Sequence, residues 1–263
     1  MGTRIREADG MDEIRAITAL MTEVWGEAFL DPGICRAIQH AGGYLAGAWQ
    51  GTRLVGASLA FLGQHEGEVV LHSHATCVAP GLGSQGLGRA VKWHQRTWAL
   101  DHGIESVEWT YDPLVARNGW FNLTTLGAVG VRYEVDFYGR MTTAIERGEE
   151  SDRCLVRWGL RDPKVEAAAR GELAPLDVEA QRSAGVPVLV SVGPDAAPLY
   201  GEAAAEGPVL AQVHPDVEAL RTDEPDMAAR WRRALRETLG EAMEEGRHLT
   251  AAGRDGWYLA EPA

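Results

Sequence analysis

The stretch LHSHATCVAPGLGSQGLGRAVKWHQRTWAL, residues 71–100, decides how the chain is interpreted. Residues 71–78 alternate with a period of two, which predicts a buried strand. Pro80 has no N–H to donate to a sheet, so we expect the strand to end before it. A glycine-rich turn follows, and then side chains recur at helical spacing: Leu87, Val91, His94 and Trp98. The stretch therefore predicts a strand, a loop and an amphipathic helix.

The glycines at positions 81, 83, 86 and 88 lie at the start of the predicted helix. The first N–H groups of a helix lack partners within it, and the helix dipole adds partial positive charge there. Such a turn suits a phosphate or pyrophosphate, although a plain flexible turn and helix cap has the same composition. No Gly-Lys-Ser/Thr follows, so it is not a P-loop. It is also not a dinucleotide fingerprint, because Glu108 falls inside the next strand and the loop follows several strands.

Composition narrows the classes of protein. The formal net charge is −13, which argues against a nucleic-acid partner. No apolar run approaches the length of about 18 residues that a membrane span needs, and the first residues lack the apolar core of a signal peptide. The cysteines Cys35, Cys77 and Cys154 form neither a disulfide framework nor a zinc spacing, so no metal is expected. A cytoplasmic protein without a membrane partner is the expectation.

The rest of the chain predicts alternating helices and strands. Strands are expected at 3–8, 44–49, 53–62, 71–78, 106–111, 131–137 and 153–160, and helices at 12–25, from 32 to about 42, at 87–100 and at 115–126. In residues 163–263, strands are expected at 186–192, 208–213 and 256–260, with a long helix at 225–245. The pattern indicates an α/β (α+β) fold with a mixed sheet flanked by helices.

The turn resembles the acyl-CoA pyrophosphate loop of the GNAT N-acyltransferase superfamily. Residues 78–80 (VAP) and 85–90 (QGLGRA) carry this resemblance, and the predicted order of elements is the GNAT order. The family's loop begins with Gln or Arg, whereas this chain has Gly83 there, and Arg89 is a candidate for the missing charge. Residues 109–114, 117–123, 136–139, 151–153 and 229–232 are similar to a group of predicted bacterial GNAT proteins. The resemblance implies a GNAT domain at 1–162, and we interpret 163–263 as an appended α+β unit that packs on it.

The resemblance also implies acetyl-CoA, or another acyl-CoA such as succinyl-CoA, as co-substrate. The backbone of Thr76, Cys77 and Val78 would then hold the pantetheine arm. The pyrophosphate would lie on Gly83, Ser84, Gln85, Gly86, Leu87, Gly88, Arg89 and Ala90. Asn118 and Phe121, on the helix after the fifth strand, would contact the CoA arm, although a plain helix-start asparagine and a core phenylalanine would give the same residues.

Candidate catalytic residues come from the strands. Period-two alternation predicts that His72, His74, Thr76 and Val78 share one face of their strand, and that Cys77 lies opposite. An imidazole is a suitable base for the amine proton, with His74 preferred over His72, although two structural histidines would give the same pattern. Nothing near Cys77 indicates a lowered thiol pKa, so an acyl-enzyme route is not favoured.

Four further assignments complete the predicted site. Asp112 would bind a substrate ammonium or orient a histidine, or else cap the turn before Pro113. The helix that commonly carries the family's tyrosine acid has no tyrosine here, and Tyr138 is one substitute. Trp25 is expected to line a substrate pocket, because the resemblance implies this role for the loop after the first helices, although a tryptophan at such a place is more often part of the core. Arg117 or Arg132 is expected to pair with a substrate carboxylate.

The reaction implied is acyl transfer to a primary amine, such as the α-amino group of an amino acid, by direct attack in a ternary complex. Two alternatives remain: a non-catalytic acyl-CoA sensor and a protein lysine acetyltransferase, for which the charge of −13 is a poor match. A homodimer is a further expectation from the resemblance.

Overall fold

The computed structural model describes residues 2–26, 30–65, 67–83, 86–139, 150–202 and 205–263. The chain forms two compact units. Unit 1 comprises Met1–Trp109 with Gly159–Arg161, and unit 2 comprises Thr110–Trp158 with Asp162–Ala263. The compact units therefore divide the chain inside its fifth strand, not at residue 162, where the sequence predicts the domain border.

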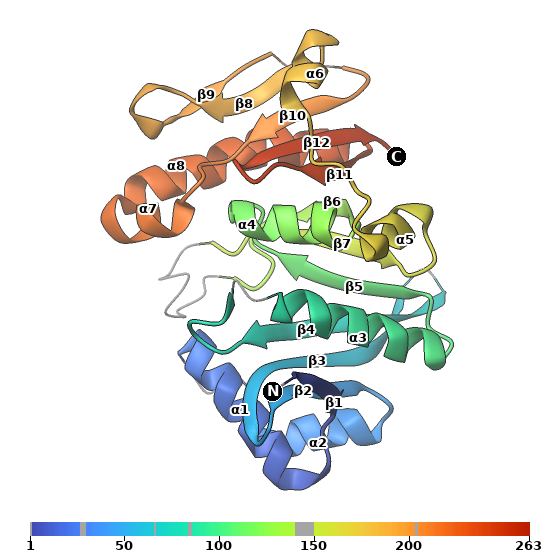
Figure 1. The fold of residues 1–263 in the computed structure, drawn as a ribbon. Helices are drawn as coiled ribbons and strands as arrows, with labels where there is room; N and C mark the ends of the chain where they lie inside the picture. Colours follow the sequence, from blue (N-terminus) through green and yellow to red (C-terminus); the bar gives the residue numbers. More distant parts are fainter. Residues whose placement is uncertain (1, 27–29, 66, 84–85, 140–149, 203–204) are drawn as a thin grey trace. The chain divides into compact units, whose positions relative to one another are not determined.

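Unit 1 contains the first part of the predicted order of elements (Figure 1). They are β1 (Arg4–Glu7), α1 (Gly10–Trp25), α2 (Pro32–His40), β2 (Tyr44–Gln50), β3 (Arg53–His65), β4 (Glu68–Val78), α3 (Leu87–Asp101) and the first residues of β5 (Ser106–Tyr111). The strands from β1 to β5 are neighbours in chain order. Pairing is antiparallel from β1 to β4 and parallel between β4 and β5, so this sheet is mixed, as expected.

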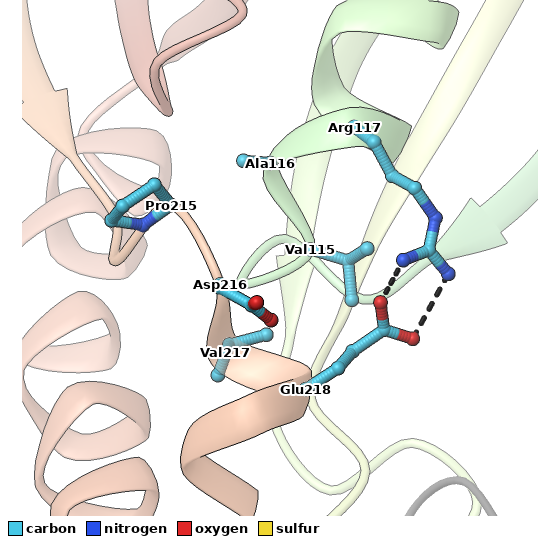
Figure 2. A pocket seen from close by; sticks show the side chains of 7 residues that line it. All are labelled: Val115, Ala116, Arg117, Pro215, Asp216, Val217 and Glu218. Atoms are coloured by element: carbon cyan, nitrogen blue, oxygen red, sulfur yellow. Dashed lines mark hydrogen bonds and ion pairs between the residues drawn. The ribbon is translucent and has the colours of Figure 1, made fainter.

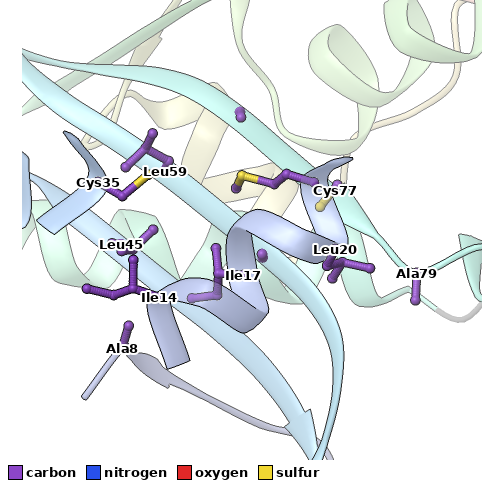
Figure 3. Close-up of a cluster of buried hydrophobic side chains, with 12 residues drawn as sticks. Ala8, Ile14, Ile17, Leu20, Cys35, Leu45, Leu59, Cys77 and Ala79 are labelled. Carbon is purple, nitrogen blue, oxygen red and sulfur yellow. The ribbon is translucent and has the colours of Figure 1, made fainter. Parts of the chain in front are cut away.

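Helices cover both faces of the unit 1 sheet. On one face, α1 buries Ile14 and Ile17 against Leu45 and Leu59 (Figure 3). On the other face, Leu87 and Val91 of α3 pack with Ala48 and Val55. The spacing of Ile14, Ile17 and Met21 places these side chains on one stripe of α1, and burying each stabilises the fold by about 1.5–3 kcal/mol.

Unit 2 contains more helices and strands than the sequence pattern predicts. Its elements are α4 (Ala116–Gly119), a π-helical turn (Trp120–Thr125), β6 (Val129–Glu134), β7 (Arg153–Gly159), α5 (Pro163–Arg170), α6 (Val178–Ser183), β8 (Val188–Val192), a 3-10 turn (Pro194–Ala196), β9 (Pro198–Tyr200), β10 (Val209–Gln212), α7 (Val217–Asp223), α8 (Pro225–Leu235), a second π-helical turn (Arg236–Gly240), α9 (Glu241–Glu244), β11 (Arg247–Ala252) and β12 (Trp257–Pro262). The expected helices at 115–126 and 225–245 are therefore each interrupted by π-helical geometry.

The C-terminal strands of unit 2 extend the sheet that β6 and β7 begin. The strand order is β7-β6-β11-β12-β10-β8-β9, and Leu249 of β11 pairs with Gly130 of β6. A Cβ at Gly130 would lie 2.9 Å from the Cβ of Leu249 and 2.8 Å from the Sγ of Cys154, so only glycine fits this close approach. The strand β11 had no counterpart among the expected strands. Residues 163–263 thus share a sheet with residues 110–158.

Candidate functional site

The end of β4 carries a β-bulge at His74. Leu59 of β3 pairs with Ala75, and the next residue, Ala60, pairs with Ser73, so β4 has one residue more than β3 at this point. A bulge bends its strand and interrupts the regular alternation of side chains. The histidine preferred as a base on sequence grounds is this extra residue.

The bulge divides the predicted histidine face in two. His72 and His74 lie beside Phe61, with ring centroids 4.9 and 6.0 Å away, on the face that carries Leu59. Thr76 instead hydrogen-bonds across to Ser58 on the α3 face, where Val78 also packs. The expectation that all four residues of the strand share one face is wrong, because alternation counts assume no extra residue.

Cys77 also lies on the opposite face from the one predicted. It packs in the core beneath α1, on the histidine side of the sheet (Figure 3). Burial raises the pKa of its thiol to about 12. A thiol with so high a pKa is a poor nucleophile near neutral pH, so the structure gives no support to an acyl-enzyme route through Cys77.

The ladder between β4 and β5 is short. It consists of the pairs Leu71 with Val107 and His72 with Glu108. On its other edge, β4 stays paired with β3 up to Val78. The segment 73–78 therefore lies past the end of the β5 ladder, and it contains the three residues predicted to hold a pantetheine arm.

The loop after β4 leads to the N-terminus of α3. The backbone turns at Ala79, whose carbonyl accepts a hydrogen bond from Leu82 N at 3.1 Å. Gly86 occupies the N-cap position of α3 with a left-handed φ of 72° and, as a glycine, has no side chain to cap the helix. Apart from its chain neighbours, a Cβ built at Gly83 or Gly86 would meet no atom of the described residues within 4 Å, so space is open over both glycines. An anion has room to approach the first N–H groups of the helix.

The remaining residues assigned to the pyrophosphate, from Leu87 to Ala90, form the first turn of α3. Leu87 is buried in the core, while Gly88 and Arg89 are partly buried and Ala90 is exposed. The guanidinium of Arg89 lies 6.0 Å from the ring of Trp93. Ser84 and Gln85, also assigned to the pyrophosphate, lie outside the described residues.

The two histidines have pKa values suited to a base. Burial lowers the pKa of His74 below its ordinary 6.5. Burial also lowers that of His72, as do the neighbouring His74 and Lys92, while Glu108 opposes the shift. Both imidazoles are therefore mainly neutral at pH 7, the form that accepts a proton.

A polar network under the bulge was not predicted. Lys92 of α3 is only 3% exposed, and its ammonium donates to Ser73 Oγ at 3.0 Å and to Gln95 Oε1 at 2.6 Å. The amide of Gln95 donates in turn to Ser58 Oγ at 3.2 Å. The sequence contained a signal for a buried lysine. Position 92 adjoins Val91 on the apolar stripe of the helix, and the chain has just one other lysine, Lys164.

Asp112 lies in unit 2, in a buried ion-pair cluster. Its carboxylate accepts two hydrogen bonds of 2.9 Å from Arg232 and forms a further ion pair with the guanidinium of Arg221. It also accepts the N–H of Leu114 at 2.9 Å, which is the turn-capping alternative. Burial alone would raise the pKa of Asp112, but the two arginines outweigh it and hold the pKa well below its ordinary range. This geometry favours a structural role over a substrate ligand.

Both arginines predicted to meet a carboxylate already face one from the chain. Arg117 of α4 pairs with Glu218 of α7, one contact measuring 2.9 Å, beside a cleft of about 290 Å³ (Figure 2). Its side chain is 67% exposed. Arg132 pairs with its neighbour Glu134 at the surface. A substrate carboxylate would have to displace these partners.

The remaining predicted residues lie apart along the chain. Trp25 packs against the α1 core of unit 1. In unit 2, Asn118 belongs to α4 and Phe121 to the following π-helical turn, both partly buried. Tyr138 is exposed, with its hydroxyl 3.5 Å from Thr110 Oγ1 and its ring under the guanidinium of Arg153. The binding and catalytic roles assigned to these residues stay predictions.

Within the described ranges, no group of three or more histidine, cysteine, aspartate or glutamate side chains is arranged to hold a metal ion. None of the helices described is long and apolar enough to cross a membrane.

Solved structures of acetyltransferases have folds similar to that of this chain. The ribosomal-protein-S18-alanine N-acetyltransferase of Escherichia coli is 14% identical, with a TM-score of 0.50, over 60% of this chain and 94% of that chain. YncA of Salmonella typhimurium, solved with its cofactor acetyl-CoA, is 17% identical over 62% and 96%, with a TM-score of 0.49. An acetyltransferase of the GNAT family from Streptococcus pneumoniae is 17% identical over 59% and 98%, at 0.47.

No family model matches the sequence, and no curated protein matches it. The structural likeness to the Escherichia coli enzyme, together with the order of strands and helices, shows that the chain has the GNAT fold. This confirms the fold expected from the resemblance. At 14% identity the likeness extends to the fold alone.

Proposed function

We propose that the protein is an acyl-CoA-dependent N-acyltransferase. The observation that carries the proposal is that the bulged strand β4 is followed by open space over Gly83 and Gly86 and by the N-terminus of α3, where Gly86 has no side chain to cap the helix. This arrangement offers strand backbone for an extended arm and helix N–H groups for a pyrophosphate, within a GNAT fold.

The backbone of Thr76, Cys77 and Val78 would hold the pantetheine arm and help polarise the thioester carbonyl. The turn from Gly83 to Ala90 would hold the pyrophosphate. Anchoring both ends of the donor fixes its carbonyl for attack, which lowers the entropic part of the barrier. Donors aimed at the carbonyl oxygen stabilise the charge that develops there during attack.

In the proposed reaction, the acceptor nitrogen attacks the thioester carbonyl carbon. A C–N bond forms, the C–S bond breaks, and CoA leaves as a thiolate. His74 takes the proton that the amine loses, with His72 second, because burial keeps both imidazoles neutral. Tyr138 is our candidate to return a proton to the thiolate.

The acceptor is proposed to be a small primary amine, with the α-amino group of an amino acid favoured and acetyl or succinyl as the acyl group. This preference rests on the resemblance of residues 109–114 and 117–123 to the group of bacterial GNAT proteins. A protein lysine acetyltransferase is less favoured. A screen that contains both free amino acids and lysine peptides separates these two classes of acceptor.

Thermal melting tests the proposal. The purified protein is melted with acetyl-CoA, succinyl-CoA, free CoA and NAD separately, because a ligand that binds only the folded state raises the melting temperature. We expect a rise with the CoA compounds and none with NAD. No shift with any CoA compound would overturn the proposal. The thioester with the larger shift then enters a screen of amine acceptors for released thiol.

A non-catalytic acyl-CoA sensor is the second candidate. Two observations favour it. The segment Ala116–Thr125, after β5, contains no tyrosine to act as the usual acid, and Gly83 replaces the usual Gln or Arg. A sensor and an enzyme would both melt at higher temperature with acyl-CoA. Thiol release that depends on added amine supports the enzyme, and its absence across the screen supports the sensor.

A further inference from the structure

Lys92 is placed where a helix of this kind carries an apolar side chain. It belongs to the buried stripe of α3 that also contains Leu87, Val91, Gln95 and Trp98. Its ammonium contacts two neutral oxygens, on Ser73 and Gln95, and lies 3.9 Å from the centre of the Trp109 ring. Burying an ammonium is costly, and burial lowers the pKa of Lys92 to about 7. The other side chains of the stripe fill the core without a charge, so packing alone does not account for a lysine here.

The position of the ammonium coincides with the end of the β4–β5 ladder. The last two pairs are Leu71 with Val107 and His72 with Glu108, so the next residues in register are Ser73 and Trp109. Lys92 contacts the side chains of both residues. The ammonium thus joins the first pair of side chains beyond the ladder.

A second branch of the network reaches the other side of the bulge. Gln95 accepts from Lys92 and donates to Ser58, whose hydroxyl lies 2.9 Å from that of Thr76. Lys92 is therefore linked to Ser73, just before His74, and through two side chains to Thr76, just after the bulge. The network holds β4 on both sides of the bulged residue.

We propose that Lys92 is a positioning residue for acyl-CoA, which fixes both the point where β4 and β5 stop pairing and the shape of the bulge beyond it. This inference rests on the proposed function. Its ammonium keeps the side chains of Ser73 and Trp109 bridged, so that the β4 segment 73–78 retains one backbone shape for the donor. Preorganisation of this kind strengthens binding without a direct contact between Lys92 and the ligand.

The first test compares three variants by calorimetric titration with acetyl-CoA. Lys92→Met keeps the length of the side chain and removes the ammonium, and Ser73→Ala removes one of its acceptors. Lys164→Met is the matched control, because Lys164 is also partly buried but belongs to unit 2 and donates to the carbonyls of Ala128 and Thr250.

We expect Lys92→Met to weaken the Kd for acetyl-CoA by about tenfold or more, and Ser73→Ala by less, without a lower melting temperature for Lys92→Met. Lys164→Met should leave the Kd unchanged. A merely structural lysine would change the melting temperature and leave the Kd of the folded protein as it was, which would overturn the inference. Wild-type protein that binds no acetyl-CoA would overturn the proposed function as well.

A second test needs no variant of Lys92. The chain has two lysines, so protein labelled with ¹³C at the lysine ε-carbon gives two NMR signals, assigned with Lys164→Arg. The signal of Lys92 should lie upfield, because the ammonium lies over the Trp109 ring. Acetyl-CoA should move this signal and leave that of Lys164 in place. A Lys92 signal that does not move while the wild type demonstrably binds acetyl-CoA would overturn the inference and leave the function standing.

Discussion

The two units bury polar groups in different ways. In unit 2, the carboxylate of Asp112 is held between the guanidinium groups of Arg221 and Arg232, all three at most 8% exposed by side chain. In unit 1, the ammonium of Lys92 contacts a hydroxyl, an amide oxygen and an indole ring. Opposite charges compensate each other in the first centre, whereas the contacts named for the second centre join the cation to neutral oxygens and an aromatic ring.

The pKa values of the two centres differ for this reason. The arginines hold the pKa of Asp112 far below its ordinary range in spite of burial, which fixes the carboxylate in its charged form. Burial instead brings the pKa of Lys92 to about 7. The paired centre joins elements distant in sequence and suits a role in stability. The lysine centre lies under a bulged strand beside two neutral histidines and suits a role in function. We therefore expect substitutions in unit 2 to change mainly stability and those near β4 to change mainly binding and rate.

Asp112→Asn should produce the largest effect. It removes the negative charge and leaves two buried guanidinium groups facing a neutral amide, which should lower the free energy of unfolding by about 3–5 kcal/mol. The folded-state pKa is lowered, so the carboxylate stabilises the fold above its unfolded pKa of about 3.9 and loses that contribution as pH falls towards the folded pKa. Urea unfolding at pH 7 measures the loss, which should shrink in acid.

Glu134→Gln is the matched control for this prediction. It breaks the pair between Glu134 and the exposed Arg132 in the same unit. A surface pair contributes about 0–1 kcal/mol, so this variant should unfold at nearly the wild-type urea concentration. Equal losses for the two variants would show that the buried cluster is no more important to stability than a surface pair.

His74→Asn tests the chemistry on the β4 side. It should reduce kcat by about a hundredfold or more while the Kd for acetyl-CoA stays within a few fold, because the base is lost and the donor site remains. In the wild type, kcat/KM should fall as pH drops below 6.5, since burial lowers the pKa of His74 and only the neutral form accepts a proton. The variant should lose this acid limb. An unchanged limb together with a slow His72→Asn would assign the base to His72.

In the first 160 residues the sequence predicts the order of elements well, because the strand and helix periods are local. It predicts neither the bulge at His74 nor its effect on Thr76 and Cys77, because an extra residue in one strand is defined only by its pairing with β3. The pairing of Asp112 with Arg232 could not be predicted from the sequence either. Arg232 lies 120 residues away, on a helix whose pattern shows only an apolar stripe. Lys92 could have been noticed from its place on the stripe of α3, although an isolated lysine usually extends into solvent.

Gly86→Ala tests whether the N-terminus of α3 binds the pyrophosphate of the donor, and Gly103→Ala is the matched control. The two glycines lie just outside the two ends of α3, with φ angles of 72° and 73° and open space around both. An alanine at either place is strained by about 1 kcal/mol, so the melting temperatures should fall alike. Only Gly86→Ala should also weaken acetyl-CoA, by about tenfold, because its methyl group enters the space over the helix N–H groups. Equal affinities for the two variants would remove the pyrophosphate from this end of α3.

Arg117→Ala should produce the smallest effect on stability, and it asks whether unit 2 also contributes to substrate binding. The pair with Glu218 is exposed, so its loss should change the free energy of unfolding by at most about 1 kcal/mol (Figure 2). If Arg117 meets the carboxylate of a succinyl donor, the variant should raise the KM for succinyl-CoA and leave that for acetyl-CoA unchanged. Glu218→Gln should do the reverse and lower the succinyl-CoA KM, because it removes the carboxylate that competes for the guanidinium. If Arg117→Ala and Glu218→Gln both keep the wild-type KM for acetyl-CoA and for succinyl-CoA, the Arg117–Glu218 pair is a surface contact only. The residues that bind the acyl donor would then be confined to unit 1.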